Sequence, residues 1–118
     1  MKARPVEFNQ YTKSSYFYIG KKYWSVADLW KAADKIKPVK VPLQGINISE
    51  ERALANSVYE LVDEMKRVLR ADLSYPILLT PEGEICDGVH RVSKALLKDK
   101  KYIMVKRFTV MPDGSTDE

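Results

Sequence analysis

The side chains with the clearest chemical potential lie in one short stretch, between a predicted strand and a predicted helix. They form the run Asp87-Gly88-Val89-His90-Arg91, and Lys94 follows about one helical turn later. The first backbone N–H groups of a helix have no partner within the helix, so here they would point out of the glycine turn. Cationic side chains at this point are opposed by the helix dipole unless an anion lies between them. The run therefore predicts a site for a phosphate-bearing ligand.

The phosphate would be bound by two cationic side chains and by the backbone of the turn. Arg91 suits bidentate contact with phosphate oxygens, and Lys94 is the next candidate ligand. Gly88 permits close approach of the backbone, and it would donate N–H groups together with Val89. These residues make up the predicted phosphate-binding or nucleotide-binding set, to which His90 also belongs.

Asp87 and His90 are the candidate catalytic residues. His90 would donate to phosphate or shuttle a proton, and the alternative is a hydrogen bond that only stabilises the fold. Asp87 would hold a metal ion, act as a base, or brace the turn. Glu84 is close enough in sequence to join Asp87 in a magnesium site, although we favour a solvated turn for Glu84. The alternative role of Arg91 is a salt bridge to one of these two carboxylates.

The positive charge of the chain is concentrated after this run. The whole chain carries 20 Lys and Arg against 16 Asp and Glu, a net charge of +4. Residues 90–107 alone hold seven basic side chains and one acidic one, or +6, so the rest sums to −2. A second candidate function is therefore a non-enzymatic DNA-binding or RNA-binding protein. Its backbone track would consist of Lys98, Lys100, Lys101 and Arg107.

The composition predicts one folded domain. Of the 118 residues, 45% are hydrophobic and 31% are charged, and no apolar run has the length of a leader core or a membrane span. Cys86 is the one cysteine, so it cannot form an internal disulfide or a cysteine zinc site, and we expect a small buried side chain. We expect a cytoplasmic protein without a membrane partner. Its expected parts are a flexible arm at 1–14, a domain at 15–109 and a flexible tail at 110–118.

Hydrophobic periodicity places this site in an α/β domain of the α+β kind, with a small mixed sheet packed by helices. Helical spacing predicts helices over residues 26–36, 50–70 and 89–98. Apolar runs and turn signals predict an aromatic hairpin over 16–25 and strands over 39–43, 76–80, 85–86 and 102–108.

Two of these elements carry a prediction about the core. The helix over 50–70 would begin after Ser49, and its apolar stripe is predicted to be core. In the helix over 89–98, the residues expected to face inward are Val92, Ala95 and Leu96. The aromatic residues of the hairpin would form its core or, as an alternative, a base-stacking surface.

The motifs together resemble the ParB/sulfiredoxin-like superfamily. The matching segments, within residues 16–108, are Trp24 to Leu43, Tyr75 to Leu79, Gly83 to Arg91 and Ala95-Leu96. The first is similar to the start of small ParB-like proteins of bacteria and their phages, and the Asp-Gly-x-His-Arg pattern is similar to the motif of ParB-fold free-serine kinases. The resemblance implies that the loop holds nucleotide phosphates, with ATP or CTP and magnesium as ligands and hydrolysis or phosphoryl transfer as the reaction.

The departures from the family patterns narrow this expectation. Val89 stands where sulfiredoxins carry their catalytic cysteine, so sulfiredoxin chemistry is not expected. Partition proteins usually read Gly-Glu-Arg-Arg where this chain reads Gly88 to Arg91, and the chain is too short for their additional DNA-binding and dimerisation domains. The family label also suggests a metal-dependent nuclease at the same loop, which is the third candidate function.

Overall fold

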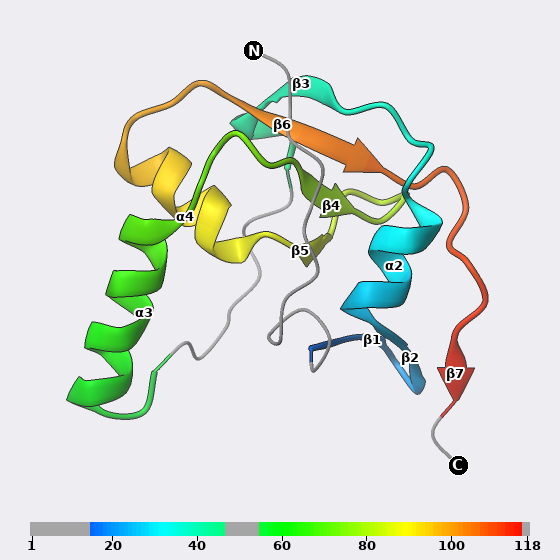
Figure 1. Ribbon diagram of the computed structural model, residues 1–118, viewed down its shortest axis with the longest axis horizontal. Coiled ribbons are helices and arrows are strands. Elements are labelled where there is room, and N and C mark those ends of the chain that lie inside the picture. Colours follow the sequence, from blue (N-terminus) through cyan, green and yellow to red (C-terminus); the bar gives the residue numbers. More distant parts are fainter. Residues whose placement is uncertain (1–14, 47–54, 117–118) are drawn as a thin grey trace.

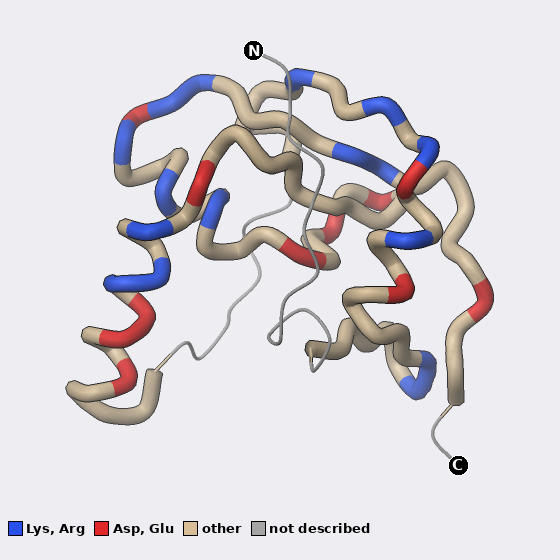
Figure 2. Tube along the Cα trace, viewed as in Figure 1, with Lys and Arg blue, Asp and Glu red and all other residues tan. Residues whose placement is uncertain are grey.

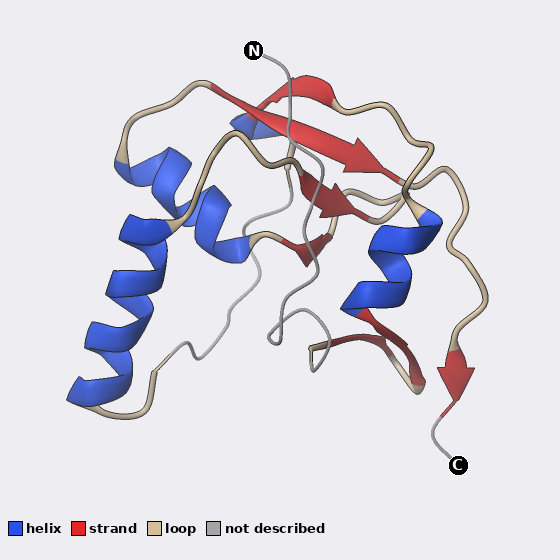
Figure 3. Cartoon of the chain, viewed as in Figure 1, coloured by secondary structure: helices blue, strands red, loops and turns tan. Residues whose placement is uncertain are grey.

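The computed structural model describes residues 15–46 and 55–116. These residues form three α-helices, one short 3-10 helix and seven strands in two sheets (Figures 1 and 3). The predicted mixed α+β class is therefore confirmed. No helix among the described residues is long and apolar enough to cross a membrane.

The first sheet is built on the aromatic hairpin. Strands β1 (Tyr16–Ile19) and β2 (Lys22–Ser25) pair antiparallel, as predicted, with Phe17 opposite Trp24. Phe17 and Trp24 are buried, whereas the alternate tyrosines lie on the exposed face. Strand β7 (Ser115–Thr116) adds to β2, and the Trp24 indole N–H donates to the Pro112 carbonyl at 2.9 Å. Part of the segment predicted as a flexible tail is thus paired with the sheet.

The second sheet has four strands in the order β3-β6-β4-β5. These are β3 (Val39–Pro42), β6 (Tyr102–Arg107), β4 (Ile77–Leu79) and β5 (Ile85–Asp87). The β4–β6 pair is parallel and the other two pairs are antiparallel. The 3-10 helix η1 (Leu43–Gly45) follows β3.

Strand β4 lies between two groups of buried side chains, because its alternate residues point to opposite faces of the sheet. Leu78 packs with the hairpin and with α2, in the group that contains Trp24 and Trp30. Ile77 and Leu79 pack on the other side, with side chains of α4 and β6. The continuous apolar run correctly predicts a strand that is buried on both faces.

Helix α2 (Val26–Ala32) connects the two sheets. Its N-cap is Ser25, whose hydroxyl accepts a hydrogen bond from the Asp28 N–H at 3.1 Å. The side chains of Leu29 and Trp30, both in this helix, are buried. The helix is shorter than the predicted 26–36 because Ala33 is already its C-cap, although the chain continues in turns.

Helix α3 (Val58–Arg70) departs from the prediction in its burial. The predicted cap Ser49 lies outside the described residues, and the observed N-cap is Ser57, which accepts from the Glu60 N–H at 3.1 Å. The prediction that its apolar stripe is core is wrong, because no residue of α3 is buried. Helical periodicity defines an apolar face but does not supply a partner for it.

Helix α4 (Val89–Leu97) begins at the glycine turn, as predicted. Val92 and Ala95 are buried, but Leu96 is 47% exposed, so its predicted inward position is wrong. The N-cap Gly88 has a left-handed backbone with φ +118°. A Cβ at this position would lie 2.5 Å from Ile77 Cγ2, so the turn packs directly on β4.

We therefore predict that Gly88→Ala destabilises the fold by about 3 kcal/mol, since the left-handed backbone and the clash with Ile77 act together. Urea denaturation measures this loss. Gly45→Ala is the matched control: a Cβ there meets no atom within 4 Å, and the backbone is not left-handed. Equal effects of the two substitutions would contradict the prediction.

Candidate functional site

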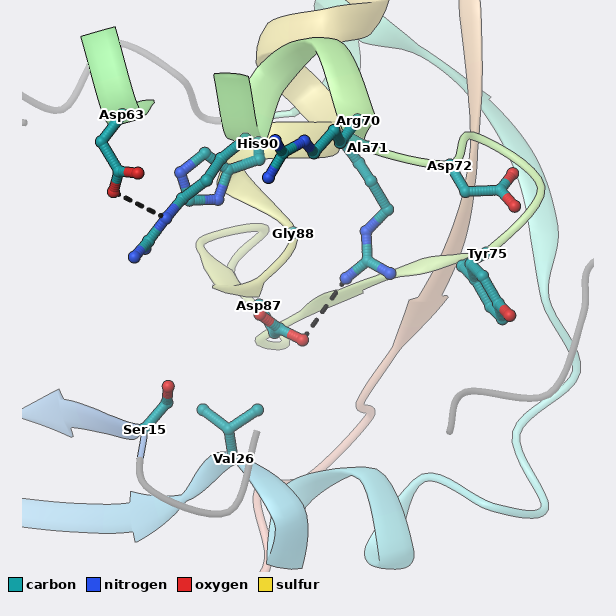
Figure 4. Close-up of a pocket in the computed structure, with 12 residues that line it drawn as sticks. Ser15, Val26, Asp63, Arg70, Ala71, Asp72, Tyr75, Asp87, Gly88 and His90 are labelled. Carbon is teal, nitrogen blue, oxygen red and sulfur yellow. Dashed lines mark hydrogen bonds and ion pairs between the residues drawn. The ribbon is translucent and has the colours of Figure 1, made fainter. Parts of the chain in front are cut away.

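A cavity of about 690 Å³ opens where the predicted motif meets the end of α3. The start of α4 and the last turns of α3 form one side, and the entry to the hairpin lies across from them (Figure 4). The lining residues come from segments far apart in the sequence. They are Ser15, Val26, Asp63, Arg67, Arg70, Ala71, Asp72, Tyr75, Asp87, Gly88, His90 and Arg91.

Asp87 is held at the cavity wall by two donors. Its Oδ2 accepts from the indole N–H of Trp30 at 2.8 Å. It also accepts from Nη2 of Arg91 at 3.3 Å, the bond drawn as a dashed line at Asp87 in Figure 4. The Arg91 guanidinium also lies 5.9 Å from the centroid of the Trp30 ring. The salt bridge between Arg91 and Asp87, which the sequence leaves open as an alternative to phosphate binding, is present.

Arg91 is a largely buried cation, with 14% of its side chain exposed. Burial lowers the pKa of Arg91 below its ordinary value, and the charge and hydrogen bond of Asp87 act in the opposite direction. A guanidinium keeps its charge at neutral pH in such surroundings. Arg91 therefore places a fixed positive charge at the cavity wall.

His90 joins α4 to α3. Its Nε2 lies 2.6 Å from Oε2 of Glu64, so the structural hydrogen bond expected as one alternative is present. His90 and Arg91, in the first turn of α4, thus each have a carboxylate partner in the protein, Glu64 for His90 and Asp87 for Arg91. These carboxylates supply negative charge beside the N-terminus of α4. From the sequence, a bound anion is expected to fill this role.

Three predicted site residues, Val89, Lys94 and Glu84, are not among the residues that line the cavity. Lys94 Nζ donates to the carbonyls of Leu69 at 2.9 Å and Ala71 at 2.7 Å, where it caps the C-terminus of α3. This is the end of a helix that attracts a cation. Glu84 is exposed at the far end of β5 from Asp87, so the structure does not assemble the predicted Asp87–Glu84 magnesium pair.

The predicted polynucleotide track is divided. Arg107 donates through Nε to the Pro81 carbonyl at 3.0 Å, and its neighbour Lys106 donates to the Ala33 carbonyl at 3.1 Å. Three exposed lysines remain around the connection between α4 and β6, visible as blue segments in Figure 2. They are Lys98, Lys100 and Lys101.

Sequence reasoning missed the contribution of α3. Arg67 pairs with Asp63 at 3.3 Å, whereas Arg70 is exposed and has no hydrogen bond or ion pair among the described residues. The signal was the spacing of these two arginines, three positions apart in the last turns of the helix. The apolar stripe of the same helix predicts a core position, and a core helix is not expected to supply ligand-binding side chains.

The carboxylates at the site fit a phosphate-bound magnesium ion better than a metal held by protein alone. Within residues 15–46 and 55–116, no group of three or more His, Cys, Asp and Glu side chains is placed to hold a metal ion. Magnesium beside nucleotide phosphates commonly uses only one or two carboxylates. Asp87 fits this use, because its Oδ1 has no hydrogen bond among the described residues.

Cys86 lies next to the site but faces the core. It is buried among the side chains of the hairpin group, as the sequence predicts. Burial, with smaller contributions from the negative charges of Asp87 and Glu84, raises the pKa of Cys86 to about 12. The nucleophilic thiolate is therefore absent near neutral pH.

Comparison with known proteins identifies no relative: no family model, no curated protein and no solved structure matches the chain.

Lys94→Met is expected to destabilise the fold by about 1–2 kcal/mol, because it removes two charge-assisted hydrogen bonds at the C-terminus of α3. Urea denaturation without ligand measures the effect. Lys100→Met, at an exposed position, should change stability by less than about 0.5 kcal/mol. A Lys94 variant as stable as the parent would show that the cap has no energetic role.

The raised pKa of Cys86 predicts a loss of stability at high pH. The unfolded thiol ionises near its ordinary pKa of 9.0 and the folded thiol near 12, so stability falls as pH rises through this interval. Urea denaturation at pH 8 and pH 10.5 would show a smaller decrease for Cys86→Ala than for the parent chain. Equal decreases would mean that the thiol ionises alike in both states.

Proposed function

We propose that the cavity at the start of α4 binds the phosphate groups of a nucleotide. The observation that carries the proposal is the position of Arg70. Its exposed guanidinium has no partner among the described residues, and it lines the same cavity as Arg67, Arg91 and the glycine turn. A cation without a partner beside an uncapped helix N-terminus favours an anionic ligand.

The backbone of α4 supplies the second part of the binding site. Gly88 is the N-cap, and among the described residues no side-chain hydrogen bond caps the helix. The first N–H groups of the helix, beginning at Val89, therefore remain available as donors beside the cavity. Phosphate oxygens accept hydrogen bonds from such groups and are stabilised by the positive end of the helix dipole.

The charge and size of the cavity favour a small ligand over a polynucleotide. Three arginines and three aspartates line the cavity, so its formal charge is balanced and offers no excess for a long polyanion. Asp63 and Asp87 pair with Arg67 and Arg91, whereas the guanidinium of Arg70 and the N-terminus of α4 remain as the groups that attract an anion. A volume of about 690 Å³ lies within the range of small-molecule sites.

Tyr75 adds an aromatic surface to the same cavity. Nucleobases stack on aromatic side chains with little sequence preference. A nucleotide can therefore place its phosphates toward Arg70 and the start of α4 and its base toward Tyr75. ATP and CTP are the ligands to test first, because the Asp-Gly-x-His-Arg resemblance implies them.

The reaction that such a site supports is nucleotide hydrolysis or phosphoryl transfer. Asp87 would contact a magnesium ion through Oδ1, and the ion would neutralise charge on the phosphates. The imidazolium form of His90, with Nε2 bonded to Glu64, would donate its Nδ1–H to a phosphate oxygen. Arg91 would act mainly through its fixed charge, since its guanidinium is bonded to Asp87.

Arg70→Gln is the substitution that tests the proposal. It should weaken nucleotide binding about tenfold or more, because it removes the guanidinium that has no protein partner. Calorimetric titration and thermal shift with ATP, CTP and GTP, with and without magnesium, provide the measurement. Lys66→Gln is the matched control, since Lys66 lies on the same helix and does not line the cavity.

The other outcomes distinguish the remaining candidate functions. If no mononucleotide stabilises the fold at millimolar concentration, the proposal fails. Binding to short DNA or RNA that falls steeply with salt and depends on Lys98, Lys100 and Lys101 would indicate a polynucleotide partner. Nicking of plasmid DNA with magnesium or manganese would indicate the nuclease.

A further inference from the structure

One side of the cavity carries a serine hydroxyl that the proposed function does not use. Ser15 lines the cavity at the entry to the hairpin, across from the start of α4 (Figure 4). Ser15 is exposed, and its hydroxyl points into the space between the two sides. Among the described residues that line the cavity, only Ser15 and Tyr75 carry a hydroxyl group. These are therefore the two alcohols that a ligand in the cavity would meet.

The backbone of Ser15 is held in place by the hairpin and by the core. Its carbonyl accepts a hydrogen bond from the Val26 N–H at 2.9 Å, next to the pair Tyr16 and Ser25 that ends the hairpin ladder. Val26 is buried in the same core group as Trp30. The Ser15 hydroxyl would therefore meet a bound ligand at a defined position, as a group on a fixed element does.

The direction of the Ser15 side chain follows from the alternation of residues along β1. Phe17 is buried in the core group that contains Cys86, and Ser15 lies two residues earlier, on the same face. Asp87 follows Cys86 at the end of β5, and its Oδ2 is bonded to Trp30 of the same group. Ser15 and Asp87 therefore lie at the same rim of this core group, where the cavity begins.

The two alcohols of the cavity have different positions relative to the proposed ligand. Ser15 and Tyr75 lie on opposite sides of Asp87 (Figure 4). With the base toward Tyr75 and the phosphates toward Arg70 and the start of α4, the terminal phosphate is the part of the nucleotide farthest from Tyr75. Ser15 is therefore the alcohol that a terminal phosphate would approach.

We propose that Ser15 is the phosphoryl acceptor of this site, so that the chain phosphorylates itself with a nucleoside triphosphate; this inference rests on the proposed function. The bond between the γ-phosphorus and the oxygen that bridges it to the β-phosphate breaks, and that oxygen leaves with the nucleoside diphosphate. A bond forms between Ser15 Oγ and the γ-phosphorus. The hydroxyl proton passes to an oxygen of the transferred group, which releases it to water at neutral pH, since phosphoserine has a second pKa of about 6.

This step requires position and charge more than a base. In phosphoryl transfer the attacking and leaving oxygens lie roughly in line, and the charge on the transferred group must be stabilised. Arg70 and the N-terminus of α4 supply positive charge on the side of the cavity across from Ser15. Because no carboxylate has to accept the hydroxyl proton, Asp87 remains available to magnesium.

Mass spectrometry of the intact chain after incubation with ATP or CTP and magnesium tests the inference. The parent chain is expected to gain the mass of one phosphoryl group, and fragmentation should place this group on Ser15 rather than on the adjacent Ser14. Ser15→Ala should lower the rate at least about tenfold, because it removes the positioned alcohol. Ser15→Thr retains a hydroxyl and should keep part of the activity.

Ser115→Ala is the matched control. Ser115 is an exposed serine of the same sheet, and it does not line the cavity, so its substitution should leave the rate unchanged. The rate constant of the parent chain should also be independent of chain concentration, because Ser15 lines the cavity of its own chain.

Calorimetric titration of the same samples separates this inference from the proposed function. Nucleotide binding to the parent chain and to Ser15→Ala, without any gain of mass by the parent, would overturn the acceptor role and leave nucleotide binding in place. Absence of nucleotide binding to the parent would mean that both proposals fail. Phosphorylation of a residue other than Ser15, or a rate constant that rises with chain concentration, would also overturn the inference.

Discussion

The candidate site depends on one carboxylate, that of Asp87. Its Oδ2 receives the indole N–H of Trp30, from α2, and the guanidinium of Arg91, from α4. Trp30 is part of the core beneath the hairpin, whereas α4 packs its buried residues on the opposite side of β4. Asp87 therefore fixes the start of α4 relative to the hairpin, and this spacing defines the cavity between them.

Several basic side chains, like Asp87, join separate elements of the fold through hydrogen bonds. Lys94, Lys106 and Arg107 each donate to backbone carbonyls of a segment that is distant in the sequence, and so they join separate elements of the fold. The local excess of +6 that the sequence shows is therefore partly structural. Fewer basic side chains than this excess suggests are left to bind a ligand, and they do not all lie in residues 90–107. At the cavity the clearest of them is Arg70.

Local patterns predicted the fold well. The apolar run at Ile77–Leu79 and the glycine turn at Gly88 depend on neighbouring residues, and both lie where they were expected. The role of Lys94 was not predictable in this way, because its acceptors are carbonyls 23 and 25 positions away. The place of Arg70 in the cavity also requires the tertiary position of α3. Periodicity identified the apolar face of that helix but not whether the same chain buries it.

The absence of buried residues in α3 has a consequence for hydrogen exchange. Within one chain, release of α3 would expose little new apolar surface, so its amides should exchange through a local opening of low free energy. The amides of β4, which is buried on both faces, should exchange only when the whole domain unfolds. Each opening of α3 would also withdraw Asp63, Arg67 and Arg70 from the cavity together. Occupancy of the cavity and protection of these amides are therefore linked equilibria.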